Sequence, residues 1–278
     1  MADGVDELAE RRARKVNEGF DPAPFREVAE SISTSIQTVR SSVDSLRRAV
    51  IRLAQSHDGS DSKFSKEDLR RLHPLLEGMI EQFGGLLLGA GYVAEPDVLA
   101  DAAHWLEWRM AKDGEFSTLE VTIDANDIAD YNYVESDWFS GPKNGVELSV
   151  VGPYVDFGGT NEYVVTLTLP VRLGESFLGV VGADLNVDRV EAILRRLTRT
   201  AGLAAMVVTS EGRVIASSVP RQYPGTLLRG LPRMLAAAER GERPLHVFDC
   251  DGLPWRLVVL GCTDPASRDG LIGECADF

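Results

Sequence analysis

Apolar and polar positions follow two different periods along this chain, and the longest helical pattern lies between residues 22 and 56. Asp21 and Pro22 precede it, an acceptor side chain followed by a proline, as is typical of a helix start. Apolar side chains then recur at steps of four and three, at Val28, Ile32, Ile36, Val39, Val43, Leu46, Val50 and Leu53. This stripe predicts one long helix. It can pack along sheets of its own chain or pair with a second copy in a parallel homodimer, and the two are compatible.

Strand-like patterns follow a second predicted helix, which begins with the capping-box pair Ser65 and Asp68 and runs to about Phe83. Strands are predicted from apolar or alternating runs at 84–95, 102–110, 116–124, 146–156, 163–173 and 177–185. The clearest hairpin joins the last two of these runs, which are β-branched and turn at Gly174. In the strand before that hairpin, Pro153 is expected to end regular pairing.

A helix and a second, smaller set of strands complete the pattern. The helix is predicted from Val187 to Thr198, with inward-facing apolar side chains at Val190, Ile193, Leu194 and Leu197. Next come a hairpin at 204–218 that turns at Glu211–Gly212, a helix near 231–240, and two strands at 244–250 and 255–261. The predicted fold class is α+β, with a charged tail at 1–20, a helical region at 21–83, a first β module at 84–200 and a second, smaller β module at 201–278.

Composition narrows the classes of partner. The 278 residues carry a formal net charge of −14, which argues against nucleic acid and against an anionic membrane surface. The sequence shows no apolar run long enough to span a membrane and no apolar core of a secretory leader. The three cysteines, Cys250, Cys262 and Cys275, match no zinc-ligand spacing and fit a reducing compartment. We therefore expect a cytoplasmic protein.

Candidate chemistry gathers between residues 131 and 188, where aromatic and acidic side chains fall on loops and strand ends. The ring faces of Trp138 and Phe139 suit an alkylammonium group, although core or lid packing explains the pair equally well. Tyr131 and Tyr154 each add a ring and a hydroxyl, and Tyr133 could do likewise. These rings, without a basic residue in the group, favour a small cationic ligand.

Two carboxylates accompany the rings. Asp156 follows Tyr154 at a step of two, so the two side chains share a face if the segment is extended. Asp184 ends a run that should be buried, and a carboxylate there needs a helix N-terminus, a backbone amide or a cationic ligand as its partner. Capping of the next helix by Asp184 itself is the structural alternative.

The sequence gives little support for catalysis, a metal or a cofactor. The four histidines are scattered without paired spacing, and no hydrolase, zinc-protease or dinucleotide motif is present. Asp124, Asp127 and Asp130 fall at triplet spacing, but the glycine and distal glutamate of a calcium loop are missing. We expect neither an enzyme nor a bound cofactor.

Several of these segments together resemble the double-Cache class of sensor domains, over roughly residues 24 to 265. The resemblance rests on ESDWF, GPYVD, YVVTLTLPV and FLGVVGADLNVDRVEAIL. It implies a long N-terminal helix, two PAS-like antiparallel β modules, and binding of a small ligand without its transformation.

The resemblance also implies a ligand site. In amino-acid-binding members a tyrosine, an arginine, a Trp–aromatic pair, a Tyr-x-Asp and a later aspartate surround the ligand. The matching positions here are Tyr131, Trp138, Phe139, Tyr154, Asp156 and Asp184. Ser136 replaces the arginine that would bind the ligand carboxylate in a bidentate pair. The amine-binding members likewise lack that arginine, so the resemblance implies an amine.

We therefore expect a sensor for a small amine, with the ligand in the first β module. Signalling would pass through a homodimer of the 22–56 helix or through a regulatory protein. The alternatives are a protein–protein scaffold of the same fold and a sensor of amino acids or carboxylates.

Overall fold

The computed structural model describes residues 21–57, 63–112, 114–119, 132–156, 162–201, 203–240 and 245–260. The chain forms two compact units, one of residues 37–186 and the other of residues 1–36 with 187–278. The boundary between the two units that was expected near residue 200 lies after Asn186. The helix that begins at Val187 packs against strands of the second unit, so it belongs to that unit and not to the first β module.

Helix α2 (Ala23–Gln55) confirms the long helix expected from the apolar stripe. Val39, Val43, Leu46 and Val50 in its second half are completely buried. These side chains are buried in the core of the chain itself. Burial of such a continuous apolar stripe stabilises a helix. The buried side chains are therefore not available to a second copy, and a homodimer would have to use a different face of α2.

Two shorter helices, α3 (Lys66–Arg70) and α4 (His73–Gln82), take the place of the single helix expected up to Phe83. The predicted capping box is present, because the Ser65 hydroxyl accepts from the Asp68 backbone N–H while the Asp68 carboxylate accepts from the Ser65 backbone N–H. Pro74 lies in the first turn of α4, where its missing N–H is tolerated. This proline explains why the helix restarts instead of continuing.

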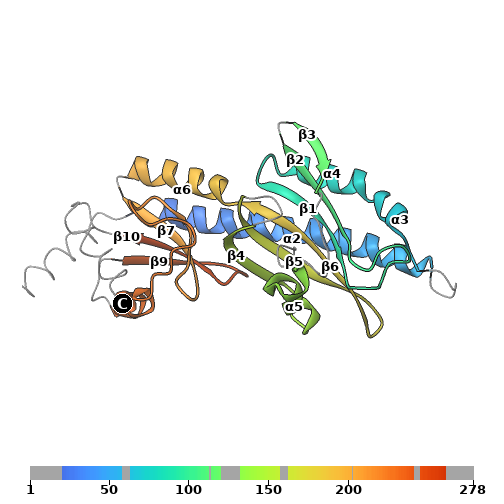
Figure 1. Cartoon of the computed structure of the whole chain (residues 1–278). Coiled ribbons are helices and arrows are strands. Elements are labelled where there is room, and N and C mark those ends of the chain that lie inside the picture. Colours follow the sequence, from blue (N-terminus) through green and yellow to red (C-terminus); the bar gives the residue numbers. More distant parts are fainter. Residues whose placement is uncertain are drawn as a thin grey trace, which may run out of the picture. The chain divides into compact units, whose positions relative to one another are not determined.

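The unit of residues 37–186 is built on one antiparallel sheet of six strands in the order β3-β2-β1-β6-β5-β4 (Figure 1). The strands are β1 (Leu87–Ala94), β2 (Leu106–Lys112), β3 (Glu115–Thr118), β4 (Ser149–Val155), β5 (Tyr163–Leu173) and β6 (Ser176–Asn186). The β5–β6 hairpin turns at Gly174, which has the positive φ of 58° that the turn requires. Pro153 interrupts the register of β4 within the strand rather than at its end.

Two elements cover parts of this sheet. Helix α4 packs against β1 and β2, and α5 (Asp137–Lys143) packs against β4, β5 and β6. Trp138 and Phe139 therefore lie on a short helix and not on the loop expected from the surrounding polar residues. Ser136 occupies the N-cap position of this helix, and its carbonyl accepts from the backbone N–H groups of Phe139 and Ser140. A 3₁₀ turn (Tyr133–Glu135) leads into it.

The second unit contains a four-stranded antiparallel sheet in the order β8-β7-β10-β9. Its elements are α6 (Val187–Ala201), β7 (Ala204–Thr209), β8 (Val214–Ser217), α7 (Leu231–Glu239), β9 (Leu245–Cys250) and β10 (Trp255–Leu260). Its hydrophobic core is formed by side chains such as Met206, Val208, Leu228 and Val258, and Glu191 of α6 is also buried and accepts from the Ser217 backbone N–H. On α6, Val190 and Leu194 are buried as expected, but Ile193 is 43% exposed, because it lies away from β7 and β8. Leu197 has no described side chain.

The fold class predicted from the sequence, α+β with a long N-terminal helix and two antiparallel sheets, is confirmed. Among the described residues, no helix has the length and apolarity needed to cross a membrane.

Candidate ligand-binding site

A cavity of about 20 Å³ lies within the unit of residues 37–186. It is lined by Val93, Leu106, Trp108, Leu119, Trp138, Tyr154, Asp156, Thr166 and Asp184. Its volume accommodates about one water-sized group. A ligand of several heavy atoms must therefore move some of these side chains apart.

The alternation of side chains along β2 separates the cavity from the helical face of the sheet. Leu106 and Trp108 line the cavity, whereas Glu107 and Arg109 bond to residues of α4. On the cavity face, α5 is tied to the sheet by the Thr168 hydroxyl, which donates to the Trp138 carbonyl at 2.6 Å. The Trp138 ring is thereby held over the strands.

Glycines on the sheet leave the space that the Trp108 indole occupies. A Cβ atom at Gly89 would lie 2.6 Å from Trp108 Nε1, and a Cβ at Gly91 would lie 2.7 Å from Trp108 Cε3. Since real Cβ atoms do not approach so closely, the ring lies on the sheet only because Gly89 and Gly91 carry no side chain.

A hydrogen-bonded chain connects three of the polar lining groups. The Thr166 hydroxyl donates to Asp184 Oδ1 at 2.7 Å, and the Tyr154 hydroxyl lies 2.6 Å from the same threonine oxygen. Because the threonine proton is directed at Asp184, the Tyr154 hydroxyl donates to Thr166. The antiparallel register places Thr166 directly opposite Asp184, so the β5–β6 pairing fixes this contact.

Burial is the main influence on the ionisation of Asp184. The pKa of this carboxyl is raised to about 7, mainly by burial; the hydrogen bond from Thr166 lowers it, and the nearby Asp156 contributes a smaller increase. Burial also raises the pKa of the Tyr154 hydroxyl. Asp184 and Asp156 are each 5% exposed. The lining side chains that the structure describes include no lysine, arginine or histidine.

Four of the eight site residues predicted from the sequence line this cavity. They are Trp138, Tyr154, Asp156 and Asp184. The expected shared face of Tyr154 and Asp156 is present at the end of β4. Asp184 lies inside β6 and bonds to Thr166, so it is not a cap of α6.

The other predicted residues have different positions. Tyr133 is 1% exposed and donates its hydroxyl to the Ala94 carbonyl, and Phe139 packs edge-on against Tyr133 and Phe177 in the core. Ser136 begins α5. Tyr131 lies outside the described residues, as do Asp124, Asp127 and Asp130.

Sequence reasoning did not single out Trp108 or Thr166 as site residues. Leu106 and Trp108 are separated by a step of two, which is the signal for two side chains on one face of a strand. Thr166 is a polar residue within the buried run of β5, at a register position opposite Asp184. Both signals become specific only when the pairing of β1, β2, β5 and β6 is known.

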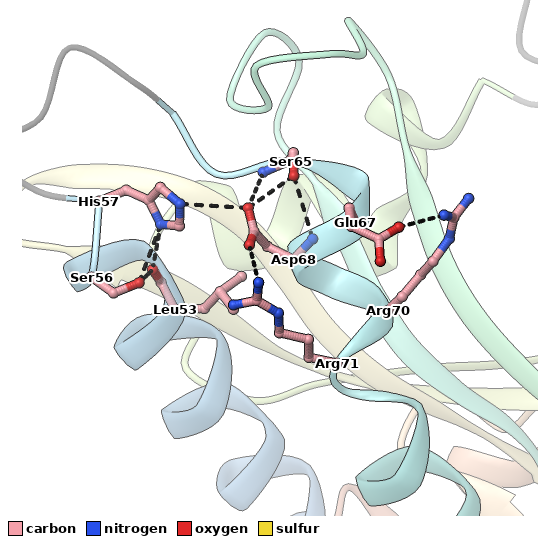
Figure 2. Close-up of polar contacts among 8 residues, drawn as sticks. All are labelled: Leu53, Ser56, His57, Ser65, Glu67, Asp68, Arg70 and Arg71. Carbon is pink, nitrogen blue, oxygen red and sulfur yellow. Dashed lines mark hydrogen bonds and ion pairs between the residues drawn. The ribbon is translucent and has the colours of Figure 1, made fainter.

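A second polar cluster, away from the cavity, contains the residue types of a hydrolytic triad (Figure 2). His57 Nε2 lies 3.5 Å from Asp68 Oδ2, and His57 Nδ1 lies 3.2 Å from the Ser56 hydroxyl oxygen. However, the Ser56 hydroxyl donates to the Leu53 carbonyl at 2.7 Å, and His57 Nδ1 also faces that carbonyl. The serine is therefore not activated by the histidine, and the cluster serves the helix ends.

Comparison with known proteins gives a match to one family model. Residues 97–192 match the first PDC sensor domain of the methyl-accepting chemotaxis protein-like family. Two curated relatives are methyl-accepting chemotaxis proteins. PscA of Pseudomonas syringae pv. tomato is 29% identical over 90 residues, which cover 32% of this chain and 14% of PscA. PctB of Pseudomonas aeruginosa is 25% identical over 143 residues, covering 47% of this chain and 23% of PctB.

Solved structures share the fold over most of the chain. Methyl-accepting chemotaxis protein X has a TM-score of 0.60 at 16% identity, covering 92% of this chain and 98% of that one. The ligand-binding domain of Mlp24 with asparagine has a TM-score of 0.55 at 14% identity, covering 95% and 98%. The ligand-binding domain of Pseudomonas aeruginosa PctB with L-Arg has a TM-score of 0.52 at 18% identity, covering 84% and 89%.

Residues 97–192 thus match a PDC sensor domain, and the chain has the fold of solved sensor domains with the double-Cache architecture. The expected resemblance to double-Cache sensors is confirmed. The curated relatives PscA and PctB are methyl-accepting chemotaxis proteins, and this chain matches only part of each.

The expected cytoplasmic location is wrong. The matched family model is that of a chemotaxis receptor sensor domain, and both curated relatives are methyl-accepting chemotaxis proteins, receptors whose ligand-binding domains lie outside the cytoplasm. The prediction was based on three features of the sequence: no recognisable secretory leader, no membrane-spanning run and few cysteines. None of these features reports where a sensor domain is located.

Proposed function

We propose that this chain is the ligand-binding region of a signalling receptor, and that its ligand is a small molecule with a positively charged amino group. The observation that carries the proposal is the pair of buried carboxylates, Asp156 and Asp184, in one aromatic-lined cavity.

The charge balance of the cavity supports a cation. An ionised carboxylate loses its hydration when it is buried, and this loss is offset only by a counter-charge or by several hydrogen bonds. No basic side chain is among the described lining residues, so a ligand ammonium group would supply the counter-charge of Asp184. The ring of Trp138 adds the attraction of its π face for such a group.

The relatives narrow the ligand class further. PctB is solved with L-Arg, PctC with GABA and Mlp24 with asparagine, and each of these ligands carries an amino group. They also carry a carboxylate, which is usually bound by an arginine fork. In this chain Ser136 stands where that arginine is expected, so we favour an amine over an amino acid.

The small volume of the cavity supports a sensing role. Because the lining must move apart to admit a ligand, occupancy would change the packing of the unit. PscA and PctB are receptors of which the matched segments form 14% and 23%. By analogy, a longer receptor, a second copy of the chain or a regulatory protein would receive the change.

The test is a thermal-shift screen followed by calorimetry. The probes are propylamine, butylamine, ethanolamine, 4-aminobutyrate, arginine, asparagine, acetate and butyrate. An amine at about one hundred times its Kd stabilises the protein by about 2.7 kcal/mol, which raises Tm by several degrees. Asp184→Asn should reduce the affinity for that amine about a hundredfold, because truncating one partner of a buried charge pair costs about 2–5 kcal/mol.

The matched control is Glu175→Gln, which removes an exposed carboxylate at the turn of the same β5–β6 hairpin. It should leave the affinity within about twofold of wild type. Binding of acetate or butyrate but of no amine would show that the charge assignment is incorrect. A panel without any response would favour the protein–protein scaffold.

A further inference from the structure

We infer that the indole N–H of Trp108 contacts the ligand and donates to a hydrogen-bond acceptor on it, so that the site selects amines that also carry an oxygen. This inference rests on the proposed function and concerns the same cavity. It adds a specificity-determining residue outside the set that the sequence pattern indicated.

The first observation is a buried donor. Trp108 is 5% exposed and lines the cavity. Among the described residues, no acceptor lies within hydrogen-bonding distance of its Nε1 atom. Burying an N–H without a partner costs about 1–3 kcal/mol, so such groups are rare in native structures. A ligand acceptor would remove this cost on binding.

The second observation is the position of that nitrogen. Nε1 lies 2.6 Å from where a Cβ atom of Gly89 would be, on the cavity face of β1. Gly89 pairs with Asp184 across the β1–β6 ladder. Cβ atoms of paired residues are about 4.5–5.5 Å apart, so the N–H and the carboxylate proposed to bind the amino group occupy neighbouring positions in the cavity that both residues line. A ligand amine and a nearby oxygen could therefore be bound together.

The third observation is that the ring is fixed. Gly91 leaves space for the rest of the indole, because a Cβ atom there would lie 2.7 Å from Trp108 Cε3. A donor whose direction is set by packing loses little conformational entropy on binding, which favours a specific contact. Trp105 provides the contrast, because its Nε1 already donates to Glu107 at 2.9 Å.

The experiment compares two nearly isosteric probes with wild type and Trp108→Phe. In ethanolamine a hydroxyl replaces the terminal methyl of propylamine. Phenylalanine keeps the ring and removes the N–H. We expect Trp108→Phe to reduce the affinity for ethanolamine or 4-aminobutyrate about tenfold. This is the effect of losing one buried hydrogen bond of about 1.4 kcal/mol. Propylamine should change by less than about twofold.

Two further measurements separate ligand contact from folding. Trp105→Phe, which removes an indole N–H already bonded to Glu107, should leave the ratio of the two affinities unchanged. In wild-type protein, the ¹⁵N–¹H signal of the Trp108 indole should move downfield with ethanolamine and much less with propylamine. This spectrum contains four indole signals, one for each tryptophan, and the signal missing from Trp108→Phe assigns it.

The outcomes are distinct. Equal weakening of both probes, or of neither, would show that Trp108 only packs, while amine binding would still stand. Binding of propylamine but of no acceptor-bearing probe would overturn the inference in the same way. If no probe binds, both the proposed function and the role of Trp108 are contradicted.

Discussion

Asp68 and Asp184 belong to the same compact unit, yet their surroundings differ in almost every respect. The carboxylate of Asp68 accepts from the backbone N–H and the hydroxyl of Ser65, and both Arg71 and His57 lie near it (Figure 2). These donors lower the pKa of Asp68, the Ser65 backbone N–H being the largest cause. Asp184 is buried beside another acid and receives the Thr166 hydroxyl, and its pKa is raised to about 7.

The difference separates a carboxylate that stabilises a helix start from one that is proposed to bind a ligand. The protein itself satisfies Asp68, and the result is a stable junction at the start of α3. The charge of Asp184 is left for another partner to balance. A buried acid with few donors near a cavity is therefore a better ligand-site candidate than an acid rich in hydrogen bonds.

The largest expected effect is that of pH on ligand affinity. A cationic ligand prefers the ionised form of Asp184, so binding below its pKa of about 7 must release a proton. Affinity for an amine should therefore rise up to about tenfold per pH unit between pH 5 and 7 and level off above pH 8. Calorimetry across this range, in buffers of different ionisation enthalpy, measures both the affinity and the released proton. An affinity independent of pH would contradict the contrast with Asp68.

The next effect is on the free energy of unfolding without ligand. The pKa of Asp184 is raised from 3.8 to about 7, so the folded state holds the proton more tightly between these values. Its contribution to stability is present below pH 3.8 and is lost as pH rises to about 7. Urea unfolding of wild type and Asp184→Asn should show this decline in wild type alone. The same slope in both proteins would assign it to other groups.

Asp68 should act in the opposite direction and with a smaller magnitude. Because its pKa is lowered in the folded state, its stabilisation is present above the ordinary carboxyl pKa and is lost as pH falls through the lowered value. At pH 7 Asp68→Asn should cost about 1 kcal/mol, in the range of a helix cap. Ligand affinity should not change. Denaturant titration measures the first quantity and calorimetry the second, and a loss of affinity would mean that the two regions are coupled.

The smallest expected effect concerns the hydrogen bond from Thr166 to Asp184. The hydrogen bond from Thr166 lowers the pKa of Asp184, and Thr166→Val removes it with little change in volume. The midpoint of the pH dependence of binding should therefore move upward, by less than about one unit. Thr168→Val, whose hydroxyl bonds to the Trp138 carbonyl instead, provides a control without this shift. A downward shift would contradict the proposed hydrogen-bond direction.

Charge also differs between the two compact units. Acidic residues outnumber basic ones by 24 to 12 between residues 37 and 186, whereas the other unit, residues 1–36 with 187–278, has 19 acidic and 17 basic residues. The negative charge is thus concentrated in the unit that contains the cavity. An excess of one sign around a site raises the local concentration of oppositely charged ligands, which agrees with a cationic ligand.

The sequence by itself determined the elements and several site residues of this protein. The spacing of Val39, Val43 and Leu46 dictates a helix, and the β-branched runs around Gly174 dictate a hairpin, because these patterns are local. The step of two between Tyr154 and Asp156 sufficed to put both side chains on one face of a strand.

The tertiary structure alone decided how neighbouring aromatic residues divide between site and core. Trp138 and Phe139 are adjacent on α5 and both belong to the buried cluster that contains Tyr133, yet only Trp138 lines the cavity. The position of the Trp108 ring depends on two glycines of β1, and the bond between Thr166 and Asp184 depends on strand register. Such contacts join residues far apart in the chain, so only the pairing of the strands brings them together.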